Sequence, residues 1–303
     1  MNVGLPDTYF TAPPEWRWLV ICYFFVGGIA GGTYFLAALL DLFGELTDRP
    51  LARLGYLVAF PAIVVSGVLL IFDLQRPLRF WHMLLQSNTG WPMFKAWSPM
   101  SVGSWALLLF GAFAFLSFLA ALAEARWVRW RRPSVLRPPG LLGTLITIVG
   151  GVLGFYVAGY TGVLLSVTNR PIWADTWLLG LTFIVSAASI SAALLILLAY
   201  AEGWTTTGVY ALKRFDSWSL VLEFVVLIAL VASLGTVARA WLSVWGVFLL
   251  LVVIIGIVAP LVLHWRRFGL GRLTAPAAAV LVLVGGFLLR VVLVFASEMQ
   301  KVV

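Results

Sequence analysis

Acidic residues, cysteine and histidine are all scarce in this chain. Its 303 residues include only 12 Asp or Glu, one Cys and two His. The single cysteine, Cys22, excludes a disulfide framework and any iron–sulfur cluster held by this chain alone. Charged residues make up 11% of the chain and hydrophobic residues 62%, whereas a typical soluble domain carries about 25% charged residues. This balance excludes a water-soluble domain and indicates a chain that is solvated by lipid.

The positions of histidine and lysine exclude two common membrane cofactors. His82 falls in a predicted loop and His264 at the far end of the seventh predicted span, so the two cannot ligate one heme together. Lys95, Lys213 and Lys301 lie outside the apolar segments, which leaves no lysine for a retinal Schiff base. The sequence therefore predicts neither heme nor retinal in this chain.

Apolar segments predict the fold. No basic region precedes the first of them, so a cleaved signal peptide is not expected and this segment should remain as a helix. A helix crosses a bilayer with about 20 apolar residues. We expect an all-α integral membrane protein, a single polytopic domain over 1–303 with eight transmembrane helices in two packed four-helix groups. The predicted spans are 18–41, 54–73, 101–123, 141–166, 176–201, 217–237, 241–264 and 275–297.

Lysine and arginine predict the orientation of the bundle. The loops after spans one, three, five and seven hold 12 of these residues, and the tails and other loops hold seven. Because cytoplasmic loops are enriched in Lys and Arg, the first set is expected to face the cytoplasm and both termini to lie outside. The net charge of +8 is expected to meet lipid headgroups and not nucleic acid.

Polar residues from several spans converge on the predicted outer face. Asp73 ends span two, and a carboxylate at the edge of the hydrocarbon is costly, so it is a candidate functional residue. The alternative is that Asp73 only caps the span and pairs with Arg76 or Arg79. Spans one, four and eight and the neighbouring loops add further candidates at the same depth: Tyr23, Arg76, Tyr160, Asn169, Arg170, Trp173 and Arg290.

This set of residues suits an amphipathic ring such as a quinone. Oxidation of a hydroquinol needs a group that accepts a hydroxyl proton, and Asp73 is the candidate. A tyrosine is expected to orient the opposite oxygen. The long outer loop, 74–100, is rich in aromatic residues and is expected to contain an interfacial helix and to dock a partner.

Other polar and small residues have two readings each. Asp41 and Glu223 lie nearer the cytoplasmic face and are candidates for a proton route to the outer site. The favoured alternative is that each pairs with a neighbouring Lys or Arg or reaches the interface. The glycine-rich run 27–32 in span one allows close helix contact, which we favour over room for a flat ring.

Several runs resemble the NrfD/PsrC-like membrane subunits of quinone-linked molybdenum oxidoreductases of the polysulfide reductase type. They are GIAGGTYFLAALLD in span one, DLQRPLRFW from Asp73, SPMS from Ser98 and YTGVLLSVTNRPIW from Tyr160. The similarity extends over all eight spans and is weaker in spans six and seven. The order and spacing of these runs are more specific than any one of them.

The resemblance implies a heme-free anchor in a bacterial or archaeal plasma membrane. Such an anchor binds menaquinone or ubiquinone near the outer face and exchanges electrons with a ferredoxin-like iron–sulfur subunit, which serves a molybdopterin catalytic subunit. By this resemblance Tyr160 contacts the quinone and Asp73 is the acidic residue of the D-L-x-R-P pattern. Some members carry histidine where this chain has Tyr23, and tyrosine is a poor base near neutral pH, which shifts proton acceptance onto Asp73.

Two alternative functions remain open, one within the same class of protein and one from another class. The chain alone is not expected to catalyse a reaction, and a bundle that only anchors partner subunits fits the same composition. A secondary transporter is the alternative from another class, since transporters carry broken helices at the midplane. Pro61 and Pro260 lie inside predicted spans, where they either break or simply kink the helix.

Overall fold

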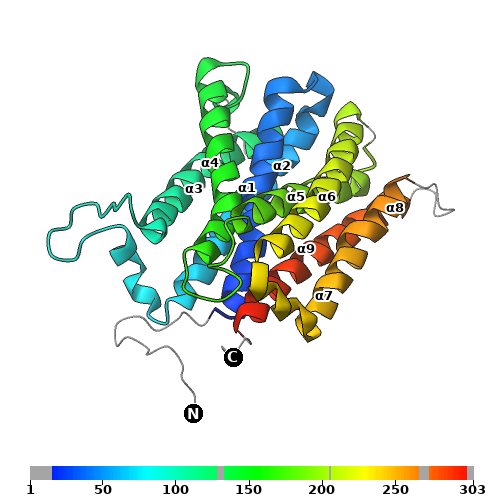
Figure 1. Ribbon diagram of the computed structural model, residues 1–303. Helices are drawn as coiled ribbons and strands as arrows, with labels where there is room; N and C mark the ends of the chain where they lie inside the picture. Colours follow the sequence, from blue (N-terminus) through cyan, green and yellow to red (C-terminus); the bar gives the residue numbers. More distant parts are fainter. Residues whose placement is uncertain (1–15, 128–132, 205, 266–272, 299–303) are drawn as a thin grey trace, which may run out of the picture.

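The computed structural model describes residues 16–127, 133–204, 206–265 and 273–298 (Figure 1). Within these ranges eight helical segments are long and apolar enough to cross a membrane, which confirms the predicted all-α, multi-pass membrane fold. The segments are α1 (Trp18–Phe43), α2 (Arg49–Asp73), α3 (Pro99–Glu124), α4 (Leu141–Ser166), α5 (Leu179–Ala201), α6 (Thr207–Ser233), α7 (Val244–Val253) with α8 (Ala259–Trp265), and α9 (Thr274–Glu298).

Successive spans run in opposite directions, so α1 begins and α9 ends at the same end of the bundle, the lower end in Figure 1. We call this the Trp18 end and the opposite one the Phe43 end. Helix α1 is the most buried of the eight segments and contacts α2, α4, α5 and α9. Helices α1 to α4 form one group and α5 to α9 the other, with α1 and α4 packed against α5 between them.

The glycine-rich run of α1 serves helix packing. A Cβ atom on Gly31 would lie 2.2 Å from the carbonyl oxygen of Gly154 on α4, and one on Gly32 would lie 2.2 Å from Ser191 Oγ on α5. Bare backbones therefore let both neighbours approach α1 closely. The packing interpretation of this run is confirmed.

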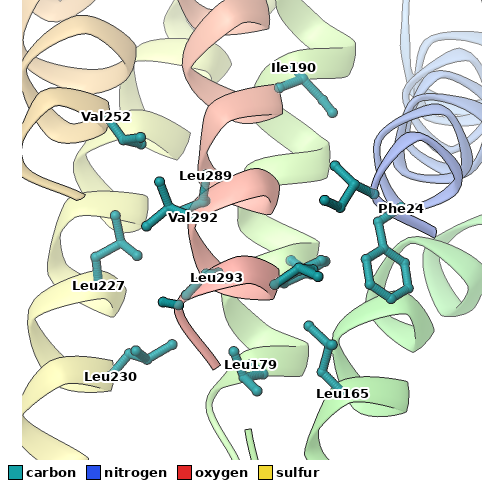
Figure 2. Packing of buried hydrophobic residues seen from close by; sticks show 14 of the residues in the cluster. Phe24, Leu165, Leu179, Ile190, Leu227, Leu230, Val252, Leu289, Val292 and Leu293 are labelled. Atoms are coloured by element: carbon teal, nitrogen blue, oxygen red, sulfur yellow. The ribbon is translucent and has the colours of Figure 1, made fainter. Parts of the chain in front are cut away.

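Apolar side chains fill the space between α5, α6, α7 and α9. Figure 2 shows Leu289, Val292 and Leu293 of α9 pointing among Leu227 and Val252 of the flanking helices. These side chains belong to one buried cluster that also reaches α1 and α4. This packing holds α9, and with it Arg290, in a fixed place beside α1.

The seventh span is interrupted near its middle. A π-helical segment, Ile254–Val258, lies between α7 and α8 and is followed by Pro260. Proline lacks a backbone N–H and its ring crowds the carbonyl one turn earlier, so the helix adopts the wider π hydrogen bonding locally. In the same segment Gly256 packs against Gly285 of α9, where a Cβ atom would lie 2.7 Å from Gly285 Cα.

Helix α6 begins at Thr207, well before the predicted start of its span at residue 217. The charged residues in its first turns resemble a loop in the sequence, which is why the span is predicted to begin after them. Two of them have hydrogen-bond partners on α5: Lys213 Nζ donates to the Tyr200 hydroxyl at 2.5 Å, and Asp216 accepts from Ser189 Oγ at 2.9 Å. Paired charges can therefore continue a helix that enters the membrane.

Short helices occupy the connections: η1 (Leu46–Asp48), η2 (Pro77–Met83), η3 (Pro133–Leu136) and η4 (Gly235–Leu242). The 74–100 loop contains one short helix, the 3-10 helix η2. An isolated bridge between Leu85 and Pro92 closes the loop, and Ser98 caps α3 by accepting from the Ser101 N–H. Several of its aromatic side chains are exposed, among them Trp91 and Trp97.

Candidate functional site

A cavity of about 490 Å³ lies between the first four helices at the Trp18 end. Its walls come from α2, α3 and η2, with Trp16, Val20 and Tyr23 at the beginning of the chain and Tyr160 and Leu164 of α4. Its volume is within the range of small-molecule sites, about 300–1,000 Å³. The cavity brings together Tyr23, Asp73 and Tyr160, three of the residues that the sequence singles out.

Asp73 is the last residue of α2 and is partly buried at the wall of this cavity. No hydrogen bond or ion pair joins its carboxylate to another residue in the described ranges, and the expected alternative, a pair with Arg76 or Arg79, is not formed there. Both arginines are exposed. A carboxylate that faces an apolar cavity without a partner has its acceptor sites available to a ligand.

The two tyrosines of the cavity differ in what their hydroxyl groups do. Tyr23 is 1% exposed, and its hydroxyl has no hydrogen-bond partner among the described residues. Tyr160 donates its hydroxyl to the Pro99 carbonyl oxygen at 2.8 Å, and its ring lies so close to Gly103 that a Cβ there would meet it at 2.0 Å. Tyr160 therefore ties α4 to the start of α3, and Tyr23 carries the hydroxyl that a ligand can engage.

Trp173 lies behind the cavity wall. It is fully buried, donates its Nε1–H to the Leu293 carbonyl at 2.8 Å and stacks on Trp16 with ring centroids 5.4 Å apart. Trp16 lines the cavity itself. Trp173 thus supports the lining residue and fixes the loop after α4 against α9.

Arg290 lies on the other side of α1 from the cavity. Its Nε donates to the Phe24 carbonyl at 3.2 Å, and its Nη1 donates to Ser186 Oγ at 3.1 Å and to the Gly286 carbonyl at 2.6 Å. The Nη2 group has no partner in the described part of the chain. The structure therefore places this guanidinium one residue behind Tyr23 and not in the cavity.

The remaining predicted contacts lie outside the cavity lining. Arg76 and Asn169 are exposed, and Arg170 is partly buried in the loop after α4. In that loop Ile172 has a positive φ of 70° although its side chain is fully buried. A β-branched residue in this conformation stores strain, which the surrounding packing holds.

A second group of buried polar residues lies between α5, α6, α8 and α9. Glu223 is in the middle of α6, 5% exposed, and interacts with Ser186 and with the charge of Arg290. Two turns earlier on α6, Asp216 accepts from Ser189 Oγ, and its second oxygen lies 3.9 Å from His264 Nε2. This group leads from the guanidinium behind Tyr23 toward the Phe43 end.

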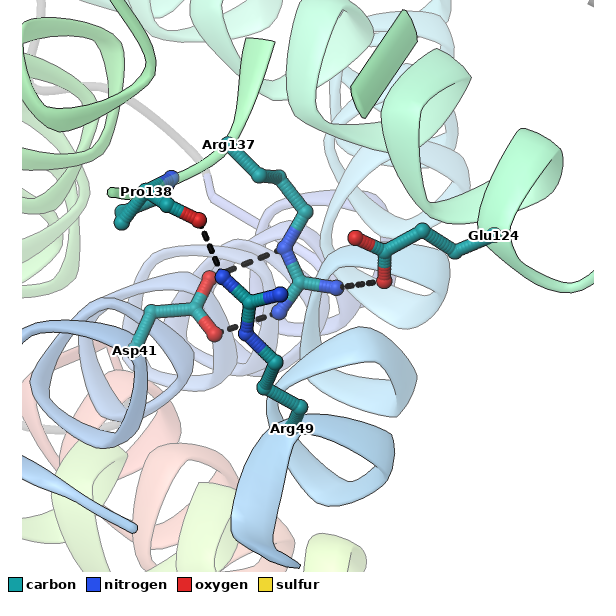
Figure 3. A network of polar contacts seen from close by, with 5 residues as sticks. All are labelled: Asp41, Arg49, Glu124, Arg137 and Pro138. Atoms are coloured by element: carbon teal, nitrogen blue, oxygen red, sulfur yellow. Dashed lines mark hydrogen bonds and ion pairs between the residues drawn. The ribbon is translucent and has the colours of Figure 1, made fainter. Parts of the chain in front are cut away.

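Asp41 belongs to a separate network at the Phe43 end (Figure 3). Arg137 donates from Nε to Asp41 Oδ2 at 3.0 Å, from Nη2 to Asp41 Oδ1 and from Nη1 to Glu124, while Arg49 donates to the Pro138 carbonyl. The guanidinium also lies 5.3 Å from the centroid of the Tyr56 ring. The favoured expectation for Asp41, a pair with an arginine, is confirmed.

The charge of Arg137 is secured by its neighbours. Burial alone lowers the pKa of the guanidinium, but the hydrogen bond and charge of Asp41 and the charge of Glu124 together raise this pKa above its ordinary value. Arg137 is 1% exposed. A protonated arginine at this position clamps the connection between α3 and α4 onto the end of α1.

Sequence reasoning did not single out several residues of the cavity or of the second buried polar group: Trp16, Gly103, Ser104, Asp216 and His264. A signal for Asp216 was present, because it lies seven residues before Glu223 and seven residues bring a helix back to the same face. No signal marked Gly103, whose role depends on the ring that packs on it from another helix.

Comparison with known proteins gives matches along nearly the whole sequence. The family model described as "Polysulphide reductase, NrfD" matches residues 9–302. A polysulfide reductase subunit from Wolinella succinogenes is 28% identical over 93% of the present sequence and 94% of its own length. The protein NrfD of Escherichia coli is 28% identical over 94% of the present sequence and 95% of its own length. A selenate reductase subunit from Mesobacillus selenatarsenatis is 22% identical over 35% of the present sequence and 23% of its own length.

Proposed function

Because this chain belongs to the polysulphide reductase NrfD family, we propose that it is a heme-free membrane anchor and quinone-binding subunit of a respiratory oxidoreductase complex. It passes electrons between the quinone pool and an iron–sulfur subunit, which serves a molybdopterin catalytic subunit. The complex lies in a bacterial or archaeal plasma membrane, with both termini of this chain outside. The observation that carries the proposal is the cavity in which the carboxylate of Asp73 and the hydroxyl of Tyr23 are without partners among the described residues.

The cavity lining fits a quinone. Apolar walls suit the ring system, and a buried donor without a partner is costly unless a ligand engages it. A quinol bound here would supply two electrons, which would pass to the iron–sulfur subunit, and two protons. The Tyr23 hydroxyl would donate a hydrogen bond to a ring oxygen, and Asp73 would accept the two hydroxyl protons in turn, releasing the first before it takes the second. Since Asp73 is partly exposed at the end of α2, the proton has a short way to the aqueous side.

The iron–sulfur subunit docks on the 74–100 loop in this proposal. Phe80, Met83 and Leu84 of this loop line the cavity, so among the described residues this loop separates a bound ring from water at the Trp18 end. On its outer side the loop exposes Trp91, at 72%, and Trp97, at 82%. Exposed aromatic residues are enriched at protein interfaces. A partner on this surface is separated from a bound ring by this loop alone.

A proton route through the second polar group stays a proposal. Asp41 is fully engaged by Arg137 and serves as a structural anchor. Glu223 remains the candidate, joined by Asp216 and His264, because buried ionisable groups inside a bundle mark pathways for ions or protons.

Tyr23→Phe is expected to weaken quinone binding by roughly two- to tenfold, the net contribution of one hydrogen bond. The unfolding temperature is expected not to fall, because the Tyr23 hydroxyl has no partner in the described part of the protein. Quenching of tryptophan fluorescence by a titrated quinone in lipid nanodiscs measures the first quantity, and thermal unfolding measures the second. Tyr160→Phe is expected to lower both the quinone affinity and the unfolding temperature, since it also removes the hydrogen bond to the Pro99 carbonyl.

Tyr56→Phe is the matched control. Its hydroxyl is also buried without a partner among the described residues, but its ring faces Arg137, away from the cavity. This variant is expected to bind quinone as the wild type does. Unchanged quinone affinity in Tyr23→Phe, or an equal loss in Tyr56→Phe, would count against the proposed role of the cavity.

A further inference from the structure

The cavity is much longer than a quinone ring. Its lining runs along α2 from Phe60 to Leu74 and along α3 from Met100 to Ala112. At 1.5 Å per residue, each stretch extends for about 20 Å along its helix. A cavity that served the ring alone would need only a fraction of this length.

Hydroxyl and carboxylate groups lie toward one end of this cavity. Tyr23, Asp73 and Tyr160 lie at the Trp18 end, and Ser104 is one turn into α3, where its hydroxyl donates to the Met100 carbonyl at 2.9 Å. Beyond this level the described lining residues are apolar, from Leu107 to Ala112 on α3 and from Ile71 back to Phe60 on α2. The cavity is therefore amphipathic along its length, as a quinone with a hydrocarbon tail is.

One glycine on each wall leaves the apolar part open. A Cβ atom added to Gly67 of α2 or to Gly111 of α3 would meet no described atom within 4 Å. This contrasts with Gly103, at which a Cβ would collide with the Tyr160 ring, and with Gly31, at which it would collide with α4. Packing therefore does not require the absence of a side chain at Gly67 and Gly111, and both line the cavity.

The far end of the apolar part is closed, and its side is open. Phe60 packs against Phe115 and Phe118 of α3, with ring centroids 5.1 and 5.0 Å apart. Between that contact and the Trp18 end, Val64 is 47% exposed and Leu108 is 49% exposed, although both line the cavity. A hydrocarbon tail that enters from the Trp18 end must therefore leave sideways between α2 and α3, where the lipid lies.

We infer that the groove between α2 and α3 binds the isoprenoid tail of the quinone and that Gly67 and Gly111 set the space for it. The inference rests on the proposed function, since the ring is held at Asp73 and Tyr23. The tail lies along the apolar wall and enters the lipid past Val64 and Leu108. Binding energy from the tail then adds to that of the ring and selects long-tailed quinones.

Gly67→Leu and Gly111→Leu test this inference in the complete complex. Each adds a side chain into open space, so neither is expected to disturb folding. Two ligands with the same ring are compared in nanodiscs by tryptophan quenching: a menaquinone with four isoprene units, and menadione, which has no tail. We expect at least a tenfold loss of affinity for the first and less than a twofold change for the second. Quinone that co-purifies from native membranes is expected to fall in parallel.

Val68→Phe is the control, because Val68 follows Gly67 on α2 but is exposed at 44% outside the cavity lining. It is expected to leave both affinities unchanged. Wild-type affinity for the tailed quinone in both glycine variants would overturn the tail groove and leave the ring site standing. Equal losses for both ligands would also overturn it, by placing the glycines at the ring. If the wild type binds neither ligand, the proposed function itself fails.

Discussion

Asp73→Asn is expected to lower quinol-dependent electron transfer by about 10²–10⁴-fold, the usual contribution of a general base. The amide keeps the shape of the side chain but cannot accept the proton. Because no described residue depends on the Asp73 carboxylate for a hydrogen bond or an ion pair, the complex should remain assembled. The rate of acceptor reduction by a quinol analogue in the purified complex measures the effect.

Glu202→Gln is the matched control for this prediction. Glu202 is an exposed carboxylate that follows α5 at the Phe43 end, remote from the cavity. The same change of charge there is expected to leave turnover within about twofold of the wild type. Wild-type turnover in Asp73→Asn would remove Asp73 as the proton acceptor. A complex that no longer assembles would instead give the residue a structural role.

Arg137→Gln is expected to destabilise the protein by about 3–5 kcal/mol, because it leaves the buried carboxylate of Asp41 without its counter-charge. The side chain of Asp41 is 1% exposed and that of Glu124 is 24% exposed, so water replaces the guanidinium poorly at Asp41. The loss should appear as a lower unfolding temperature in detergent. Quinone affinity of the protein that remains folded should not change, since this network lies at the Phe43 end of the bundle and none of its residues lines the cavity.

Two variants make this prediction specific. Arg126→Gln removes an exposed arginine from the same connection and is expected to leave the unfolding temperature unchanged. Combining Arg137→Gln with Asp41→Asn removes both charges of the pair and should recover part of the lost stability, which a double-mutant cycle measures. An unfolding temperature of Arg137→Gln equal to that of the wild type would show that the network contributes little.

Most of this fold can be predicted from the length and apolarity of the hydrophobic segments in the sequence. Each predicted span corresponds to a helical segment. A run of about 20 apolar residues that crosses a bilayer must satisfy its backbone hydrogen bonds internally, and an α-helix does so. The clear exception in position is the start of α6, where Lys213 and Asp216 resemble a loop until their partners on α5 are known. Pairing across helices is a tertiary fact that local composition does not contain.

The sequence predicted how deep in the membrane the candidate residues lie, but not which side of the bundle each of them faces. Counting residues from the ends of the spans placed Tyr23, Asp73, Tyr160 and Arg290 at one level, and the first three do line one cavity. Arg290 lies behind α1, because the face that α9 presents to α1 depends on packing with α5 and α7. The length of a segment gives depth in the membrane, whereas rotation about the helix axis requires the neighbouring helices.

Purification of the complex from its native membrane in a mild detergent, with mass spectrometry of its proteins and extracted lipids, tests the central claim most directly. The account predicts an iron–sulfur protein, a molybdopterin enzyme and bound isoprenoid quinone together with this chain. A polypeptide that purifies alone, without quinone or any redox partner, would contradict the electron-transfer function and favour a transporter.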